Sequence, residues 1–352
     1  MRFSLALNME RLEPSESMLG VTKHALEMVK MADEAGFESA LAAEHHGIEF
    51  TIAPNPFVIL THWAAHTTNL RLATGVVVAP YWHPLRVASE TALVDLYSEG
   101  RVELGIGRGA FQFEFDRMAP GLEQKDANAY LHEMVPAIKK LWRGDYAHEG
   151  EIWQFPSVTS VPKPLQSPHP PIWIAARDPR TFDFAIKQGA GVMSAPLSKP
   201  FSEMKNLAAK LHTAISNNPG CPRPRWAVIR RTCVYEHPDE WPKMAKTALE
   251  HSWRFEGLFS HSGGVSNGFP EAPAVVDGAT GHMTTDSVGE GFVHGTPEQV
   301  VEELKHYEAI GVDLYAYNPD FGLPKVQSRH SMELFIERVL PHFEVYSPDD
   351  AR

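Results

Sequence analysis

Short apolar segments alternate with amphipathic segments along nearly the whole chain of 352 residues. Each apolar segment has the length and composition of a buried strand, and a segment with helical periodicity usually follows it. Regular alternation of strands and helices predicts a parallel sheet covered by helices. The segments predicted to be strands are 2–7, 37–43, 70–80, 101–107, 171–176, 191–196, 225–236 and 312–318.

Eight strand–helix units in a chain of this length suit a single α/β domain over residues 1–352, a (β/α)8 TIM barrel with insertions after strands four and seven. An open doubly wound sheet is the alternative, and it should show a glycine-rich phosphate fingerprint after its first strand. The segment NMERLEPSES at 8–17 contains no glycine. The barrel is therefore favoured.

Two stretches interrupt the alternation. Residues 145–171 are rich in proline and lack helical periodicity, so we interpret them as an excursion on the rim of the barrel. Residues 257–294 are rich in glycine and serine and follow the seventh strand. Long, glycine-rich segments near a barrel mouth can close over bound ligands, so this second stretch is predicted to be an active-site lid.

The charge and the cysteine count exclude several classes of protein. A net charge of −12 disfavours nucleic acid and anionic membranes as partners, because both would repel an acidic surface. Two cysteines are too few for a disulfide framework. No apolar run approaches the roughly 18–20 residues of a membrane span, and the N-terminal segment has the pattern of a strand and not of a signal peptide. These features predict a soluble cytoplasmic protein.

The segment ESALAAEHH at 38–46 ends the second strand in three titratable side chains, Glu44, His45 and His46. Catalytic groups of parallel barrels lie at the carboxyl ends of the strands. Successive strand residues point to opposite faces, so if the strand continues this far the two histidines cannot both face the barrel axis. The alternative is a pair of histidines hydrogen-bonded to backbone at the edge of the core. A metal site is disfavoured because it usually needs ligands from several strands, and the first strand ends in ALNM.

Two further segments carry groups suited to a phosphorylated ligand. After the fourth strand, Gly105, Gly107 and Gly109 surround Arg108. Glycines let the backbone approach a ligand closely and a guanidinium can bind phosphate through two hydrogen bonds, although a tight turn would explain the same pattern.

The other segment, AARDPRT at 175–181, opens a helix after the fifth strand, where an amino terminus favours anions. Arg177, Arg180 and Thr181 add hydrogen-bond donors. Asp178 has the position of a helix N-cap, which is compatible with a phosphate nearby.

With these residues the sequence resembles the bacterial luciferase-like, flavin-dependent monooxygenases. Each matching segment is modest alone, but together they follow in order over nearly the whole chain. The segments are 43–57, 72–109, 171–190, 295–313 and 331–343.

The resemblance implies a (β/α)8 barrel that binds reduced FMN (FMNH2), supplied by a separate flavin reductase. The flavin would react with O2 to form a peroxyflavin, which oxidises a small organic substrate. Members of this family are usually dimers, so a homodimer is expected.

The resemblance also implies roles for individual residues. His45 matches a catalytic histidine, for which Glu44 is an orienting or structural partner. Gly75 and Val76 match a non-prolyl cis peptide that packs against the isoalloxazine ring, and Arg108 and Thr181 match contacts to the flavin phosphate. The complete set predicted to bind the cofactor is Thr74, Gly75, Val76, Gly107, Arg108, Gly109, Ala176, Arg177, Arg180 and Thr181.

The chain departs from the luciferase pattern at three positions. Asn128 stands in place of a phosphate-binding arginine, Asp178 in place of a phosphate-binding serine, and Phe111 in place of a tyrosine. Because an acidic side chain beside a phosphate is unfavourable, Arg177 or Arg180 is expected to compensate.

The substrate pocket is predicted from aromatic and basic residues near strand ends. Trp82 and Phe111 would line an apolar or aromatic pocket, although packing explains such residues equally well. Arg230 and Arg231 are neighbours on the seventh strand, so one guanidinium could face inward to meet an anionic substrate. A salt bridge within the scaffold is the alternative.

Other functions remain open on the same barrel. An F420-dependent reductase or dehydrogenase would transfer hydride and need no oxygen. A non-catalytic partner subunit, like the luciferase β chain, is disfavoured because this chain keeps Glu44, His45 and Arg108. A metal-dependent hydrolase is the remaining alternative.

Overall fold

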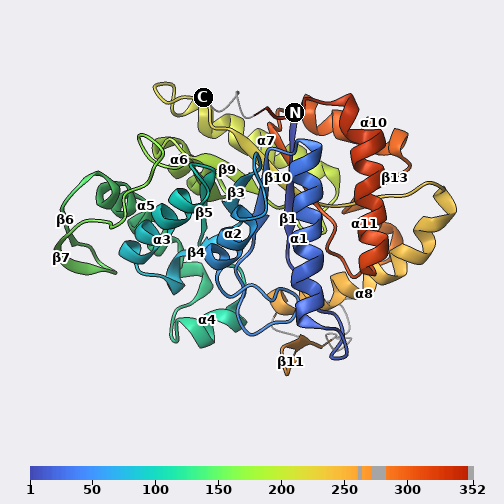
Figure 1. Cartoon of the computed structure of the whole chain (residues 1–352), viewed down its shortest axis with the longest axis horizontal. Coiled ribbons are helices and arrows are strands. Elements are labelled where there is room, and N and C mark those ends of the chain that lie inside the picture. Colours follow the sequence, from blue (N-terminus) through green and yellow to red (C-terminus); the bar gives the residue numbers. More distant parts are fainter. Residues whose placement is uncertain (261–263, 272–282, 348–352) are drawn as a thin grey trace.

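Eight parallel strands close into a barrel in the computed structural model, which describes residues 1–260, 264–271 and 283–347 (Figure 1). The hydrogen-bonded order around the barrel is β1–β2–β3–β5–β8–β9–β10–β14, and β14 pairs with β1 to complete the ring. The predicted fold class is therefore confirmed. The barrel strands are β1 (Arg2–Leu7), β2 (Ser39–Ala42), β3 (Arg71–Thr74), β5 (Val102–Gly107), β8 (Ile172–Ala175), β9 (Gly191–Ser194), β10 (Trp226–Val234) and β14 (Leu314–Asn318).

Helices cover the outside of the barrel (Figure 1). They are α1 (Met18–Ala35), α2 (Pro56–Ala64), α3 (Pro84–Tyr97), α5 (Asn128–Arg143), α6 (Pro179–Lys187), α7 (Phe201–Ser216), α8 (Trp241–Ser260), α10 (Pro297–Ala309) and α11 (Lys325–Leu334). Short additional elements are β4 (Val77–Val78), α4 (Gln112–Met118), α9 (Thr285–Glu290), 3₁₀ turns at Ala79–Tyr81, Gln124–Asp126, Pro238–Glu240 and Leu340–His342, and a π turn at Phe335–Val339. In the part of the chain that is described, no helix is long and apolar enough to cross a bilayer.

Local signals explain where the first helix begins and ends. The Ser17 side chain accepts a hydrogen bond from the Gly20 backbone N–H and caps the amino terminus of α1. At the other end Gly36 has φ 81°, a left-handed conformation that costs glycine little. Between these caps one face of α1 is buried, through Val21, Ala25, Met28, Val29 and Ala32.

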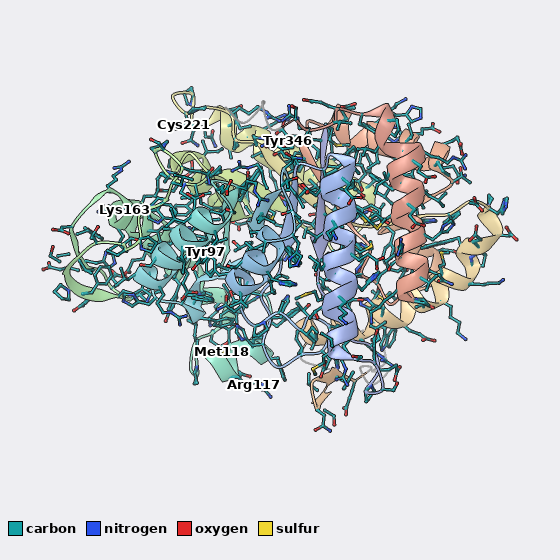
Figure 2. The ribbon with its side chains drawn as sticks, in the orientation of Figure 1. Tyr97, Arg117, Met118, Lys163, Cys221 and Tyr346 are labelled. Carbon is teal, nitrogen blue, oxygen red and sulfur yellow. The ribbon has the colours of Figure 1, made fainter. Side chains whose placement is uncertain are left out.

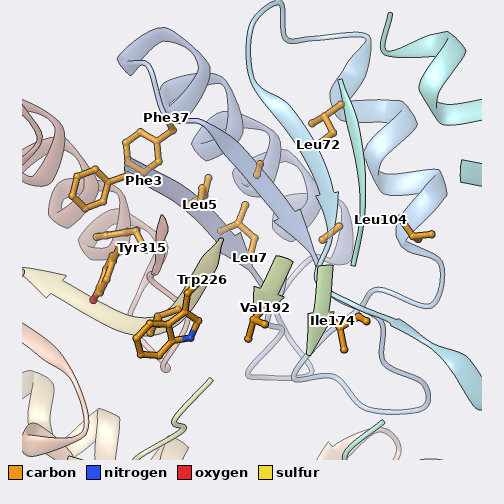
Figure 3. Packing of buried hydrophobic residues seen from close by; sticks show 14 of the residues in the cluster. Phe3, Leu5, Leu7, Phe37, Leu72, Leu104, Ile174, Val192, Trp226 and Tyr315 are labelled. Atoms are coloured by element: carbon orange, nitrogen blue, oxygen red, sulfur yellow. The ribbon is translucent and has the colours of Figure 1, made fainter. Parts of the chain in front are cut away.

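The hydrophobic core has two layers because successive strand residues point to opposite faces. The layer between strands and helices contains large side chains, many of which are seen in Figure 3: Phe3, Leu5, Leu72, Leu104, Ile174, Val192, Trp226 and Tyr315. The layer inside the barrel is smaller and richer in alanine: Ala6, Leu41, Ala73, Trp173, Met193, Ala227, Leu314 and Ala316. Small inward-facing residues leave room for a cavity at the carboxyl ends of the strands.

The stretch 145–171 contacts helices α3 and α5, and its place on the rim stays a prediction. It contains the antiparallel hairpin of β6 (Tyr146–Glu149) and β7 (Gln154–Val158). His148 in this hairpin donates to Glu133 of α5 at 2.8 Å, and Phe155 packs on His83 at the start of α3. Burial of its aromatic side chains against these helices holds the hairpin on the outside of the barrel.

The stretch 257–294 is less irregular than predicted. Helix α8 continues to Ser260, and β13 (Val293–Gly295) pairs in parallel with the end of β10. Between them lie the hairpin of β11 (Val265–Ser266) and β12 (Phe269–Pro270) and the short α9, whose capping box is formed by Thr284 and Ser287. Glycine and serine serve here as turns and caps. Residues 261–263 and 272–282 lie outside the described part, and the role of the stretch as a lid stays a prediction.

Candidate active site

A cavity of about 260 Å³ opens at the carboxyl ends of the barrel strands. Loops after β2, β3, β5, β8 and β9 contribute to its wall, and Phe255 of α8 closes one side. Most of the predicted site residues meet here, although they come from distant parts of the chain. Those that line the cavity are Glu44, His45, Gly75, Val76, Gly107, Arg108, Gly109, Phe111, Ala176, Arg177 and Thr181.

His45 faces the cavity and pairs with a carboxylate that the sequence analysis did not single out. Its Nδ1 lies 3.1 and 3.2 Å from the two carboxylate oxygens of Glu114, and its ring packs on Phe111 with centroids 5.1 Å apart. Because a carboxylate only accepts hydrogen bonds, Nδ1 carries the proton. Glu114 also accepts from the His46 backbone N–H at 2.6 Å. The pair therefore orients His45 and leaves Nε2 for proton exchange within the cavity.

Electrostatics of this pair favour the charged imidazole. Burial alone would lower the pKa of His45, but the charge of Glu114, its hydrogen bond and the charge of Glu44 together raise the pKa above its ordinary value. Glu114 itself is buried, with 1% of its side chain exposed. In the sequence it stands between Phe113 and Phe115 of α4. An acidic residue between two aromatic residues was the signal that could have revealed it, because a buried carboxylate needs a partner.

Glu44 is directed away from His45 and holds the loop after β3. Its carboxylate accepts from the Val78 backbone N–H at 2.7 Å, from Trp82 Nε1 at 2.8 Å and from His46 Nε2 at 2.8 Å. The two histidines have different partners, but β2 ends at Ala42, so the alternation of strand residues does not extend to them. Trp82 contacts Glu44 and Phe57 and is not among the described residues that line the cavity, which differs from its predicted place in the substrate pocket.

Glycines keep one wall of the cavity flat. A Cβ atom on Gly107 would lie 2.7 Å from Val76 Cγ2 and 3.3 Å from Ala175 Cβ. On Gly105 it would lie 2.0 Å from the Thr74 carbonyl oxygen, so β3 and β5 can approach only because this residue is glycine. The Gly75–Val76 peptide bond is cis, as the resemblance implies.

Thr74 does not reach the cavity, because its hydroxyl is used within the sheet. Thr74 Oγ1 donates to the Gly105 carbonyl at 2.7 Å and accepts from the Gly105 N–H at 2.8 Å. The predicted contact from this side chain to a cofactor is therefore replaced by a link between the two strands.

Two guanidinium groups converge at the far end of the cavity. Arg108 donates to the Gln124 carbonyl at 3.1 Å. Burial lowers the pKa of Arg177, and the positive charge of the nearby Arg108 lowers it further. The side-chain oxygen Oδ1 of Asn128, also in this wall, is buried without a hydrogen-bond partner. Two neighbouring cations suit a phosphate group, whereas the Asn128 oxygen is an acceptor and can give a phosphate no hydrogen bond.

The fifth-strand loop differs in detail from the prediction. Asp178 caps α6 by accepting from the backbone N–H groups of Arg180 and Thr181 at 3.1 Å, and the Thr181 hydroxyl donates to it at 2.6 Å. Thr181 therefore lines the cavity with its hydroxyl already engaged. The exposed Arg180 is not among the described lining residues, so only Arg177 of the two predicted arginines is placed to compensate for Asp178.

Arg230 and Arg231 take opposite sides of β10. Arg231 lines a second cavity that adjoins the first, in phase with Ala227 and Ile229. Arg230 is buried on the outer side, where it donates to the carbonyls of Leu197 at 3.2 Å and Glu290 at 3.3 Å. The Arg231 guanidinium therefore faces inward. The prediction that Arg230 is part of a substrate pocket is wrong, because its side chain packs between β10 and the carbonyl groups of Leu197 and Glu290.

The closed barrel and a histidine–carboxylate pair at its carboxyl end define an enzyme of the (β/α)8 class. The model of the luciferase-like monooxygenase family matches residues 1–314. The oxygenase component of the flavin-dependent trigonelline monooxygenase of Acinetobacter baylyi is 38% identical over 346 residues, 97% of this chain and 96% of that protein. The chain therefore belongs to the luciferase-like monooxygenase family and is a flavin-dependent monooxygenase, as the resemblance implies.

Solved structures agree with this assignment. Monooxygenase RslO1 from Streptomyces bottropensis has a TM-score of 0.82 at 26% identity, with 98% of this chain and 100% of that chain covered. The oxygenating constituent of 3,6-diketocamphane monooxygenase from Pseudomonas putida has a TM-score of 0.77 at 18% identity, with 99% and 100% covered. At that identity the second likeness supports the fold alone.

Proposed function

We propose that this protein is the oxygenase component of a two-component system that uses FMNH2 and O2 to oxidise a small organic substrate, with a separate flavin reductase as partner. The single observation that carries the proposal is the cavity that brings the His45–Glu114 pair, the Gly75–Val76 backbone and the guanidinium of Arg108 together. A relative named as an oxygenase component supports the separate reductase. Such a partner shares the compartment of this protein, which fits the predicted cytoplasmic location.

The residues that would hold FMN are those of the first cavity. Gly75 and Gly107 have no side chains and lie beside the short apolar side chain of Val76, a wall against which a flat ring can lie. Arg108 and Arg177 offer charge-assisted hydrogen bonds to a phosphate at the other end. Bound as FMNH2, the cofactor would supply the reducing equivalents and the site of reaction with O2.

His45 would move the proton that the reaction requires. Glu114 holds Nδ1, so Nε2 is the atom at which His45 would give or take a proton. The raised pKa keeps more of the imidazole in its charged form at neutral pH, which favours donation first. Glu44 would hold the loop and add its negative charge near His45 without exchanging a proton, because its carboxylate is occupied by Val78, Trp82 and His46.

Exclusion of water would come from α8 and the β11–β12 hairpin, which we propose as the lid. The Gly268 carbonyl accepts from the Glu49 backbone N–H at 2.7 Å, and the Arg11 guanidinium lies 5.3 Å from the Phe269 ring centroid. The hairpin thus lies on the loops after β1 and β2, at the carboxyl end of the barrel. Its position would limit unproductive reaction of O2 with water-exposed cofactor.

We also propose a homodimer that buries exposed apolar side chains of α2 and α3. Tyr97, labelled in Figure 2, has a relative exposure of 62%. Val58 has a relative exposure of 66%, and Leu93 and Leu96 on α3 are also exposed. Exposed apolar residues on two packed helices favour association. Light scattering after gel filtration should give twice the monomer mass, and a monomer at micromolar concentration would contradict the dimer.

The test of function compares FMN with F420, each oxidised and reduced. We expect FMNH2 to bind and oxygen uptake to require both this protein and a flavin reductase with NADH. Product formation would be followed with trigonelline, for which the relative is named, among the first compounds tried. Tight binding of F420 with oxygen-independent hydride transfer would contradict the proposal and support the F420-dependent alternative.

A further inference from the structure

A second cavity of about 160 Å³ lies next to the one described above. The two share a wall formed by His45, Gly75, Phe111 and Phe255. An apolar cavity of about 150 Å³ can admit one benzene-sized ring. Whatever occupies the second cavity therefore lies directly beside the residues proposed to hold the reactive ring of the cofactor and to transfer the proton.

Three phenylalanine side chains line part of the second cavity. Phe50 lies with its ring 6.4 Å from that of Phe255 at an interplanar angle of 26°, and Phe111 meets Phe255 edge-on at 5.8 Å. All three line the cavity. Flat apolar walls of this kind favour a planar, unsaturated ligand.

Arg231 brings a cation into this aromatic cavity. A guanidinium has five N–H donors, but among the described residues Arg231 donates one hydrogen bond, from Nη1 to Ser252 Oγ at 3.1 Å. Its other contacts in that part of the chain are with the rings of Phe255 and Phe292, 4.9 and 5.5 Å from their centroids. Donors remain for a ligand that accepts hydrogen bonds.

The nearby acidic groups are already engaged by other partners. Glu10 accepts from His251 Nε2 at 2.6 Å and from the Gly322 backbone N–H at 3.3 Å. Asp320 accepts from the Asn8 backbone N–H at 2.5 Å, and burial together with the charge of Glu10 raises its pKa above the ordinary value. Glu10 itself lines the second cavity, where the hydrogen bonds from His251 and Gly322 hold its carboxylate, and Arg231 keeps donors for a ligand.

Arg231 is still incompletely compensated. Burial lowers its pKa below the ordinary value, although Glu10, Glu256 and Asp320 act in the opposite direction. Bringing an anion into contact with such a group would relieve the cost of burying it.

We propose that the second cavity is the substrate site and that it takes a small aromatic carboxylate. The carboxylate binds the guanidinium of Arg231 through two hydrogen bonds, and the ring lies among Phe50, Phe111 and Phe255. The ring is then held at the wall shared with His45 and Gly75, next to the cofactor cavity. This inference rests on the proposed function and names the substrate class for that site.

The test measures binding of matched acids and amides by titration calorimetry, with and without FMN. The probes are benzoate, nicotinate and N-methylnicotinate, each paired with its carboxamide. We expect at least one acid to bind, and its amide to bind about tenfold or more weakly, because a charge-assisted contact is lost. Equal binding of each acid and its amide, or no saturable binding of any acid at millimolar concentration, would overturn the proposal.

Two variants locate the preference for the acid. Arg231→Met should abolish the preference for the acid over its amide, while the Kd for FMN stays as in the unaltered protein. Arg231→Lys should retain part of this preference, because the positive charge remains but the paired N–H donors of the guanidinium do not. Retention of the full preference in a folded Arg231→Met protein would overturn the proposal. If that variant does not fold, the comparison of acids with amides in the unaltered protein and in Arg231→Lys still decides.

Arg177→Met is the matched control, because Arg177 lines the cofactor cavity and is not among the described residues that line the second cavity. It should weaken FMN and leave binding of the acids unchanged. Failure of FMN to bind any of these proteins would count against the proposed function, whereas failure of the acids with FMN bound would count against the substrate class.

Discussion

Nδ1 of His45 lies 3.1 Å from a carboxylate oxygen of Glu114, a residue 69 positions further along the chain. The contact joins the loop after β2 to the short helix α4 that follows β5. It fixes which imidazole nitrogen is available to the cavity and raises the pKa of the histidine. The proton chemistry proposed for this site therefore depends on a partner that the sequence around His45 does not contain.

Replacing Glu114 by Gln should lower the pKa of His45. Burial favours the neutral imidazole, and in the unaltered protein the charge of Glu114 outweighs this effect of burial. The variant removes that charge, while its amide oxygen can still accept from the His46 N–H. An NMR titration of the His45 ring should show its midpoint at lower pH than in the unaltered protein. An unchanged midpoint would mean that Glu114 does not control the protonation of His45.

The same variant has a consequence for stability. A raised folded pKa stabilises the fold fully below the ordinary value of 6.5, and this contribution disappears as pH rises through the folded pKa. The difference in unfolding free energy between the two proteins should therefore be larger at pH 5 than at pH 9. Urea unfolding at both pH values measures it, and a difference independent of pH would contradict the electrostatic account.

His45→Ala should reduce substrate oxidation by about 10²-fold or more, the usual contribution of a positioned acid or base. FMN binding should persist, because the wall and the arginines of the cofactor cavity are unaltered. Turnover assays and flavin titration on the same preparation separate the two effects. Full activity in this variant would remove His45 from the mechanism.

Arg177→Met should weaken FMN binding about tenfold or more, because a charged hydrogen bond contributes about 1.5–3 kcal/mol. The exposed Arg180, three positions along, is the comparison, because it lies outside the described lining of the cavity. Arg180→Met should bind FMN as the unaltered protein does. Equal losses in the two variants would point to a general effect of positive charge and not to a contact from Arg177.

Gly105→Ala should destabilise the fold by about 1–3 kcal/mol, the usual cost of overpacking, since its Cβ would lie 2.0 Å from the Thr74 carbonyl oxygen. Gly144→Ala is the control, because a Cβ there meets nothing within 4 Å and its φ of 172° is extended backbone. Thermal unfolding compares the two. Similar melting temperatures would show that β3 and β5 can separate at little cost.

Much of the site could be predicted from the sequence, because a strand's carboxyl end is marked by where its apolar run stops. Arg108 follows such a run and Ala176 ends one, whereas Gly75 and Val76 lie inside a predicted strand and were implied by the resemblance; the barrel brings all four to one cavity. Trp82 and Thr74 occupy comparable positions, yet their polar atoms bond to Glu44 and to the backbone of Gly105. Proximity to a strand end indicates the neighbourhood of a side chain and not its direction.

The sequence by itself determined the eightfold alternation, the closed barrel and the end of the barrel at which chemistry is placed, because strand and helix periodicities are local properties of the chain. Only the tertiary structure decided that Arg231 and not Arg230 faces inward, that Asp178 occupies the Thr181 hydroxyl, and that Glu114 is the partner of His45. Those outcomes depend on which groups from distant segments meet in a buried space, where each polar atom must find a partner. No local pattern contains that information.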